Sequence, residues 1–321
     1  MSVENQQVRL GVIGLGVMGS KTLDAARSHP DYVVPFAADL GEAAVARARG
    51  AHPDVEFVSP ADVIAADLDA VYIATPPASH AELAVAAMRS GKAVFCEKPL
   101  AVSLADGRLM LEAAAETGAV NAVNFPLSST PATVHIEQSL RAGEVGDVRG
   151  IDIQLTFPVW PRPFQAPAVW VGERAEGGFV REVLSHFAYL TDRLAGPLTA
   201  VDVNLEFPAD PNTSERTAHG LLTAGDTPVH ISGQAGVAAP ETYEWTLWGT
   251  RRSYLLRAWR DLFTSDGGPW TPVDLPPTPT RSESARLTSF AQAIRGLPYT
   301  NLADFASAFR TQQAVEAFHT S

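Results

Sequence analysis

The stretch VRLGVIGLGVMGS, residues 8–20, decides the fold of the first half of this chain. Val8–Ile13 is an apolar run that predicts a buried strand, and a helical pattern follows it at once. Between them, Gly14-Leu15-Gly16-Val17-Met18-Gly19 has the spacing G-x-G-x-x-G. The first glycine allows a tight turn, the second lets the backbone approach a diphosphate, and the third allows close packing of helix on strand. The stretch therefore predicts a Rossmann βαβ unit that holds a dinucleotide diphosphate at a helix N-terminus.

The alternation of short apolar runs and helical segments continues to Cys96, which is typical of a doubly wound parallel sheet. Gly50, Gly91 and Gly118 stand where helices commonly end. The further strands that we expect are Tyr32–Ala38, Val55–Val58, Ala70–Ala74, Ala93–Cys96 and Ala119–Asn124. The expected helices are Val17–Ser28, Glu42–Arg49, Ser79–Ser90 and Ser103–Thr117.

Beyond Asn124 the pattern changes to a few helices and a succession of strands, which predicts an α+β domain with an open, mostly antiparallel sheet. The expected strands are Val148–Phe157, Leu198–Phe207, Ala218–Thr223, Val229–Gly233, Tyr243–Trp248 and Arg252–Leu256. The expected helices are Thr133–Arg141, Phe179–Ala195, Ser282–Arg295 and Leu302–Phe318, with a loop at Asp266–Pro279. We therefore expect a Rossmann domain over residues 1–124 and an α+β domain for substrate binding and oligomerisation over residues 125–321.

Charge and composition exclude several classes of partner. With 24 Lys and Arg against 36 Asp and Glu, the formal net charge of −12 disfavours nucleic acid. The only cysteine is Cys96, so an internal disulfide is impossible. The polar start, Met1–Gln7, has no apolar core of a signal peptide, and no later stretch is long enough to span a membrane. We expect a cytoplasmic protein with no membrane partner.

Asp39 stands 20 residues after Gly19, at the end of the second expected strand. A carboxylate there can accept hydrogen bonds from both hydroxyls of an adenosine ribose, and it disfavours a 2′-phosphate. Leu40 and Gly41 supply no cation for such a phosphate, so the sequence favours NAD over NADP. The alternative is that Asp39 only caps the next helix.

Four ordered motifs resemble the Gfo/Idh/MocA family, which includes glucose–fructose oxidoreductase and inositol dehydrogenase. They are the glycine motif, Ala74-Thr75-Pro76-Pro77 with His80, Glu97-Lys98-Pro99, and Gly177-Gly178 preceding His186. The resemblance extends over nearly the whole chain. It implies a nicotinamide cofactor bound with the help of Ala74, Thr75, Pro76, His80, Glu97 and Lys98.

Lys98 follows the fifth expected strand, and ligands of doubly wound sheets bind at the carboxyl ends of the strands. Pro99 favours an extended conformation for Lys98. A lysine there can donate to a substrate oxygen and, when desolvated, can move a proton. The alternative from the residues alone is an ordinary surface lysine.

The expected helix Phe179–Ala195 has two faces. One is an apolar stripe made of Val180, Val183, Leu184, Phe187, Leu190 and Leu194. The other gathers Glu182, Ser185, His186, Tyr189 and Arg193. Glu182 and His186 are four residues apart, so the carboxylate can orient the imidazole and raise its basicity. The alternative is a solvated helix face.

The resemblance implies a reaction in which a C–H hydrogen of the substrate passes as hydride to nicotinamide. His186 would take the hydroxyl proton, Lys98 would hold the same oxygen, and Glu182 would position the histidine. Relatives usually have aspartate at the positions of Glu182 and Tyr189, and this departure leaves the substrate class open. The eight histidines show no metal-ligand spacing, so no metal is expected.

Candidate substrate residues lie at two places. By resemblance Asn124 would face nicotinamide or substrate, although an Asn that satisfies a turn is the alternative. In Pro158–Pro163, Trp160 can stack on a sugar and Arg162 can bind a carboxylate, but the same loop also fits a dimer edge.

The expected function is an NAD(P)-dependent dehydrogenase or reductase acting on CH–OH of a small polyol, sugar or related metabolite. A redox-neutral NAD-using glycosidase and a non-catalytic NAD-binding regulator are the alternatives. The exposed face of the second sheet would need covering, so we expect a homodimer or homotetramer.

Overall fold

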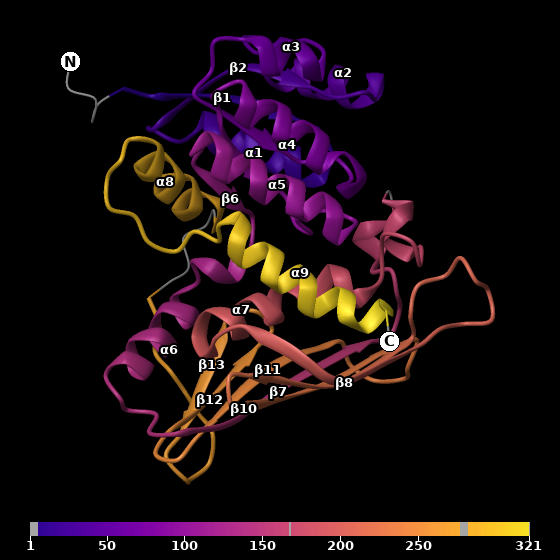
Figure 1. Ribbon diagram of the computed structural model, residues 1–321, viewed down its shortest axis with the longest axis vertical. Coiled ribbons are helices and arrows are strands. Elements are labelled where there is room, and N and C mark those ends of the chain that lie inside the picture. The colour runs from indigo at the N-terminus through magenta and orange to yellow at the C-terminus, as the bar shows by residue number, and fades with distance from the viewer. Residues whose placement is uncertain (1–5, 167, 277–281, 321) are drawn as a thin grey trace. The chain divides into compact units, whose positions relative to one another are not determined.

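The computed structural model describes residues 6–166, 168–276 and 282–320 (Figure 1). The expectations for Met1–Asn5 and for residues 277–279 of the predicted loop lie outside this part. The chain forms two compact units: unit 1 is Met1–Ser129 with Pro279–Phe309, and unit 2 is Thr130–Thr278 with Arg310–Ser321. This division differs from the predicted one, because Pro279–Phe309 returns to the N-terminal unit.

Unit 1 is built on a parallel six-stranded sheet with the order β3-β2-β1-β4-β5-β6, which is the strand order of a Rossmann fold. The strands are β1 (Val8–Ile13), β2 (Tyr32–Ala38), β3 (Glu56–Phe57), β4 (Ala70–Ile73), β5 (Ala93–Cys96) and β6 (Asn121–Val123). The prediction of a Rossmann sheet is confirmed, and β3 and β6 are shorter than predicted.

The helices of unit 1 begin and end mostly at the predicted signals. They are α1 (Val17–Arg27), α2 (Glu42–Ala51), α3 (Pro60–Ala65), α4 (His80–Arg89), α5 (Leu104–Thr117) and α8 (Ser282–Ile294). Ser103 caps α5 by accepting from the Asp106 N–H, and Gly118 ends it at φ 65°. Two predictions were wrong: α2 continues through Gly50, and α3, which Ser59 caps, was not foreseen.

Helix α8 completes the core of unit 1, although more than 150 residues separate it from the rest. Phe290 packs on Phe95 of β5 with ring centroids 5.2 Å apart. The Tyr32 hydroxyl donates to the Leu287 carbonyl at 2.6 Å. Leu287, Phe290 and residues of β1 and α1 belong to one buried cluster. This packing explains why the segment belongs to unit 1.

Unit 2 contains an eight-stranded sheet with the order β14-β13-β12-β11-β7-β10-β9-β8. The sheet is mostly antiparallel, as predicted, and only the pair β7–β10 is parallel among the described strands. Its strands are β7 (Val148–Phe157), β8 (Leu198–Glu206), β9 (Thr217–Ala224), β10 (Thr227–Ala235), β11 (Thr242–Gly249), β12 (Ser253–Arg257), β13 (Asp261–Ser265) and β14 (Thr271–Pro272). The short strands β13 and β14 were not predicted, and β14 lies within the predicted loop.

The helices of unit 2 are α6 (Pro131–Arg141), α7 (Ser185–Ala195) and the C-terminal part of α9 (Phe305–Thr320), and Figure 1 shows them on one side of the sheet. The opposite face carries many polar side chains, although Trp248 of β11 is exposed on it. In β10, for example, His230, Ser232 and Gln234 alternate with buried residues. An antiparallel sheet tolerates water on such a face. The homodimer or homotetramer stays a prediction.

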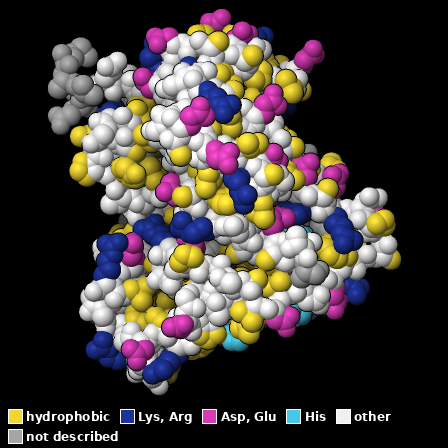
Figure 2. Space-filling model, viewed as in Figure 1, with side chains coloured by type: hydrophobic (Ala, Val, Ile, Leu, Met, Phe, Trp, Pro, Cys, Tyr) yellow, Lys and Arg dark blue, Asp and Glu magenta, His cyan; other side chains and the backbone are white. Residues whose placement is uncertain are grey.

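Acidic and basic side chains are interspersed over the face shown in Figure 2. In the part of the chain that the structure describes, no helix is both long and apolar enough to cross a membrane.

Candidate active site

The glycine motif forms the turn between β1 and α1, and each glycine is needed for a different reason. Gly14 has φ +96°, and a Cβ there would meet the backbone of Ala74. A Cβ on Gly19 would overlap the Gly14 carbonyl. At Gly16, by contrast, a Cβ would meet no described atom within 4 Å. The first and third glycines let the protein pack on itself, whereas the second leaves open space for an approaching group.

The N-terminus of α1 fits an anionic group. Gly16 is its N-cap residue, and no side chain caps the helix. Val17, the first helical residue, is 66% exposed. The first N–H groups of a helix have no intrahelical partners, and they carry the positive end of the helix dipole. The residues present therefore fit the diphosphate of a dinucleotide.

The Asp39 carboxylate ties the glycine loop to the end of β2. Its Oδ2 accepts from the Leu15 N–H at 2.5 Å, and its Oδ1 accepts from the Gly41 N–H at 2.6 Å. Gly41 is the N-cap residue of α2 and no side chain caps that helix, so Asp39 holds the residue at its start without capping the helix as the alternative proposed. The bond to Leu15 adds a contact that capping alone does not explain, because it fixes the loop beside the predicted ribose position.

His80 joins two loops at the same edge of the sheet. Its Nε2 and Nδ1 lie 2.9 and 3.0 Å from the carbonyl oxygens of Thr75 and Pro99. The side chain is fully buried, and burial lowers the pKa of His80. Carbonyls only accept hydrogen bonds, so the neutral ring donates to one of them at a time. In this structure His80 supports the loop of Thr75 and Pro76, and a direct contact with the cofactor stays a prediction.

Glu97, the residue before Lys98, is the centre of a buried polar network. Its Oε1 accepts from Asn124 Nδ2 at 2.6 Å and from the Tyr72 hydroxyl, and its Oε2 accepts from the Lys98 N–H at 3.3 Å. Burial and the neighbouring Glu97 raise the pKa of Tyr72 well above its usual value. Glu97 thus contacts the backbone of Lys98 from inside the sheet.

Helix α8 extends this network to α1. Arg286, which is buried, donates from Nε to Asn124 Oδ1 at 2.6 Å, and its Nη2 lies 3.9 Å from Glu283 Oε1. Glu283 in turn pairs with Lys21 at 2.7 Å. Both ends of the Asn124 amide are therefore bonded within unit 1, and a contact of Asn124 with nicotinamide or substrate stays a prediction. Sequence reasoning missed Tyr72 and Arg286, although an ionisable residue in a buried strand was a usable signal for the first.

Gly177 and Gly178 precede the helix of unit 2 because no side chain fits there. A Cβ on Gly177 would overlap the carbonyl groups of Trp170 and Val171. Gly178 has φ +98°, and a Cβ there would overlap the carboxylate of Glu215. Glu215 Oε1 accepts from the Val180 N–H at 2.8 Å. Burial raises the pKa of Glu215 to about 7.

The helix that carries Glu182 and His186 differs from the prediction in two ways. Its first turn, Val180–Leu184, is π-helical, and α7 begins only at Ser185. A π turn contains an extra residue, so the i, i+4 argument for a Glu182–His186 contact does not apply in its simple form. The predicted polar face is also not solvated, since Glu182, Ser185, His186 and Tyr189 are all buried.

The loop after β7 connects Arg162 to Glu182 through Gln165, a residue that sequence reasoning missed. Arg162 Nε donates to Gln165 Oε1 at 2.9 Å, and Gln165 Nε2 donates to Glu182 Oε2 at 3.3 Å. Arg162 Nη1 also donates to the Tyr243 hydroxyl at 3.1 Å. Burial lowers the pKa of Arg162, although Glu182 opposes this effect. The structure thus brings Arg162 and Glu182 together in unit 2.

A series of aromatic rings, each in contact with the next, leads from this loop to His186. Trp160 contacts Phe157, which contacts Tyr243, with centroids 4.9 and 5.6 Å apart. Tyr243 contacts Trp259 at 5.3 Å, and Trp259 lies edge-on to His186 at 5.1 Å. Trp259 was not predicted as a site residue.

Trp259 lies in the turn between β12 and β13, where the backbone is strained. Ala258 and Trp259 have φ values of 47° and 70°. Left-handed conformations cost a non-glycine residue about 1–2 kcal/mol. Hairpin turns with two positive φ values favour Asn and Gly at these positions. Neither residue is present here.

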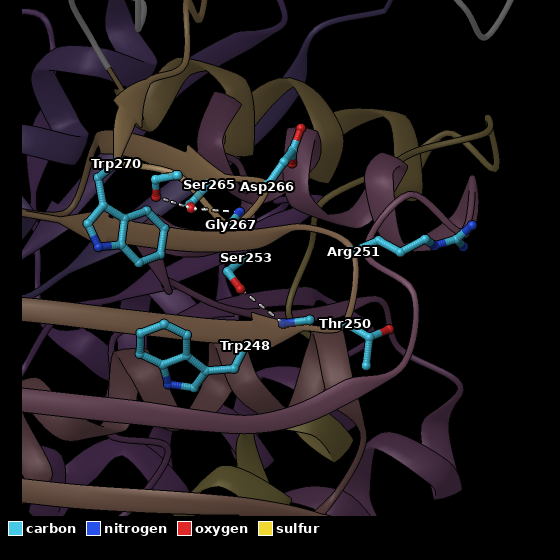
Figure 3. Close-up of a pocket in the computed structure, with 10 residues that line it drawn as sticks. Trp248, Thr250, Arg251, Ser253, Ser265, Asp266, Gly267 and Trp270 are labelled. Atoms are coloured by element: carbon cyan, nitrogen blue, oxygen red, sulfur yellow. Dashed lines mark hydrogen bonds between the residues drawn. The ribbon is translucent and has the colours of Figure 1, made fainter.

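A pocket of about 320 Å³ lies elsewhere in unit 2, and Trp248 and Trp270 are among the residues that line it (Figure 3). Arg251 and Asp266 also line it, whereas no predicted site residue does. It is therefore separate from the residues around His186. Among the described residues, no group of three or more His, Cys, Asp or Glu side chains is arranged to hold a metal.

The structure groups the predicted residues by unit. The glycine loop, Asp39, Thr75, Glu97 and Lys98 belong to unit 1, and Trp160, Arg162, Glu182 and His186 belong to unit 2. Fold and glycine loop define the class of an NAD-binding Rossmann protein with a second, α+β unit. The chain belongs to the Gfo/Idh/MocA oxidoreductase family. Residues 8–125 match the family's NAD-binding Rossmann domain and residues 133–255 its C-terminal domain.

Individual relatives are similar over part of their length. An inositol 2-dehydrogenase of Rhizobium meliloti strain 1021 is 31% identical over 179 residues, which are 56% of this chain and 52% of the relative. The chain thus matches about half of the length of this curated relative. The WlbA dehydrogenase of Bordetella pertussis, solved with NADH and UDP-GlcNAcA, has the same fold at a TM-score of 0.84 and 19% identity, covering 99% of this chain and 96% of that one. A levoglucosan dehydrogenase solved with NADH has a TM-score of 0.86 at 20% identity, and the match covers 98% of this chain and 96% of that one.

Proposed function

We propose that this protein is an NAD(H)-dependent dehydrogenase or reductase that acts on a CH–OH group of a small polyol or sugar. One observation carries the proposal: the glycine loop, Asp39 and Lys98 follow the carboxyl ends of three strands of one sheet. Ligands of doubly wound sheets bind at that edge. The names of the relatives, inositol 2-dehydrogenase and levoglucosan dehydrogenase, support the substrate class.

The bound nicotinamide would accept or supply the hydride. In oxidation, His186 takes the proton of the substrate hydroxyl, and Lys98 donates a hydrogen bond to the same oxygen. Glu182, held by Gln165, positions the histidine. Trp160 and Arg162 contribute to the substrate side. In reduction His186 returns the proton.

To test this function, the purified protein is mixed with NAD and with each member of a panel of cyclic and open-chain polyols and sugars. Net formation of NADH, followed by its absorbance, is the expected result. Product formation without net NADH would instead indicate a redox-neutral glycosidase, and NAD binding without turnover would indicate a regulator. Either outcome would overturn the dehydrogenase proposal.

We propose NAD as the preferred cofactor, because the Asp39 carboxylate repels a 2′-phosphate and neither Leu40 nor Gly41 supplies a cation. Asp39→Ala is expected to weaken NAD binding by about 10- to 100-fold, which corresponds to the loss of hydrogen bonds to a charged group. The ratio of NADP to NAD dissociation constants should fall at the same time. Two titrations of the variant measure both effects.

Asp39→Asn is the matched control, because its amide oxygen can still accept from the Leu15 N–H, whereas the charge and the second acceptor, for the Gly41 N–H, are lost. It should retain the loop and still show a narrower preference for NAD. If Asp39→Ala has the cofactor ratio of the unmodified protein, then Asp39 only supports α2 and the glycine loop.

A further inference from the structure

Trp259 contacts the proposed base from a hairpin turn that resists displacement. Its ring and the imidazole of His186 meet edge-on, with an interplanar angle of 84°. The same ring packs on Phe187, the next residue of α7, at 5.0 Å and on Tyr243 of β11 at 5.3 Å. Phe187 and Tyr243, which lie on two different elements, therefore fix the plane of the indole against His186.

Backbone hydrogen bonds also hold the turn that carries Trp259. The Ala258 N–H donates to the Tyr243 carbonyl at 3.0 Å, and the Arg260 N–H donates to the Arg257 carbonyl at 3.2 Å. These bonds tie the turn to the start of β11 and close it on itself. The position of Trp259 is thus set by main-chain contacts and not by its side chain alone.

The choice of residue is not explained by the turn or by burial. Glycine would relieve the positive φ of 70°, and tryptophan is an unfavourable residue for that conformation. The ring is also only partly buried, whereas Trp245 and Phe187 are completely buried. Residues that persist in such an unfavourable backbone conformation cluster at functional sites.

We propose that Trp259 is a positioning residue that holds the imidazole of His186 in the orientation needed for proton transfer. The inference deepens the proposed function and rests on it. Without the indole, the imidazole has more orientations available, and fewer of them align its nitrogen with the substrate hydroxyl. A misplacement of this kind lowers the rate of the chemical step while binding is largely retained.

The test compares Trp259→Gly, Trp259→Phe and Ala258→Gly. Trp259→Gly should lower kcat by about 10- to 100-fold with a much smaller change in KM and in NADH affinity. Trp259→Phe keeps an aromatic ring and should recover most of this loss. Ala258→Gly relieves strain at the neighbouring position, keeps the indole and should leave kcat unchanged.

Thermal unfolding separates positioning from a general loss of structure. Glycine relieves the backbone at residue 259, so the melting temperature of Trp259→Gly should fall much less than its kcat. A kcat within about 2-fold of the unmodified protein for Trp259→Gly would overturn the proposal. So would a loss of kcat in Ala258→Gly equal to that in Trp259→Gly.

A second measurement does not depend on turnover. With ¹³C-labelled histidine, the ring signals of His186 are identified by their absence in His186→Gln. Trp259→Gly should shift and broaden them, whereas Ala258→Gly should not. If the protein turns over no substrate of the panel, the proposed function fails, yet unchanged His186 signals in Trp259→Gly would still overturn the positioning role by themselves.

Discussion

Replacing either Lys98 or His186 by alanine is expected to lower kcat by at least about 10²-fold and to leave NAD affinity nearly unchanged. In the proposed reaction His186 takes a proton in the transition state, and Lys98 stabilises the negative charge that develops on the same oxygen. Because the two residues serve one transition state, their effects should not add. The double variant should be little worse than the poorer single variant. Steady-state kinetics with the best substrate of the panel measure kcat for the two single variants and the double variant.

His230→Ala is a suitable control, since His230 is an exposed histidine on the open face of the unit 2 sheet. Its kcat should match that of the unmodified protein. Near-normal turnover by His186→Ala on that substrate would remove His186 from the mechanism. Lys98 would then be the first candidate for the base.

The second expected result concerns stability and pH. Burial raises the pKa of Glu215 to about 7, and its Oε2 is buried with no hydrogen-bond partner in the described part of the chain. Between its usual pKa of 4.5 and about 7, the folded state holds a proton that the unfolded state releases. The contribution to stability is therefore complete below the unfolded pKa and is lost as the pH rises through the folded pKa. The loss is about 3 kcal/mol by pH 8.

Glu215→Gln cannot titrate and keeps an acceptor for the Val180 N–H. Urea unfolding at pH 5 and pH 8 should show a smaller decrease in stability for this variant than for the unmodified protein, by about 3 kcal/mol. Glu82→Gln, at an exposed position of α4, is the control and should leave the pH dependence unchanged. Parallel pH profiles for Glu215→Gln and the unmodified protein would show that Glu215 is ionised in the folded state throughout this range.

The Rossmann sheet could be predicted because its signals are local. Strands buried on both faces are continuous apolar runs, and β1, β2 and β5 begin and end where those runs do. The errors concern weaker local signals. Helix α3 has only six residues, and β14 has two, so neither repeats its pattern twice. At Gly50, which is exposed, the helix α2 continues for only one residue beyond the glycine at which it was predicted to end.

The candidate site could be predicted only in part. The motif explains why glycine is needed at positions 14 and 19, and the structure shows the close packing of Gly14 and Gly19. The network of Tyr72, Glu97 and Arg286 joins residues that are far apart in the sequence, and no periodicity reports such pairing. The π turn before α7 has no distinct sequence pattern, so an α-helical period was assumed where one more residue is present.

The return of α8 to unit 1 has a consequence for synthesis of the chain. Phe290 and Leu287 fill the core beside Phe95 and Tyr32, and Arg286 satisfies Asn124. The first unit to leave the ribosome therefore cannot close until residue 294 has followed it. At about 5–20 residues per second, the 165 residues between Ser129 and Ile294 take on the order of 10 to 30 s to make. For that time the N-terminal sheet lacks the apolar side chains that α8 packs against it, and unit 2 in turn waits for its own last segment, Arg310–Ser321.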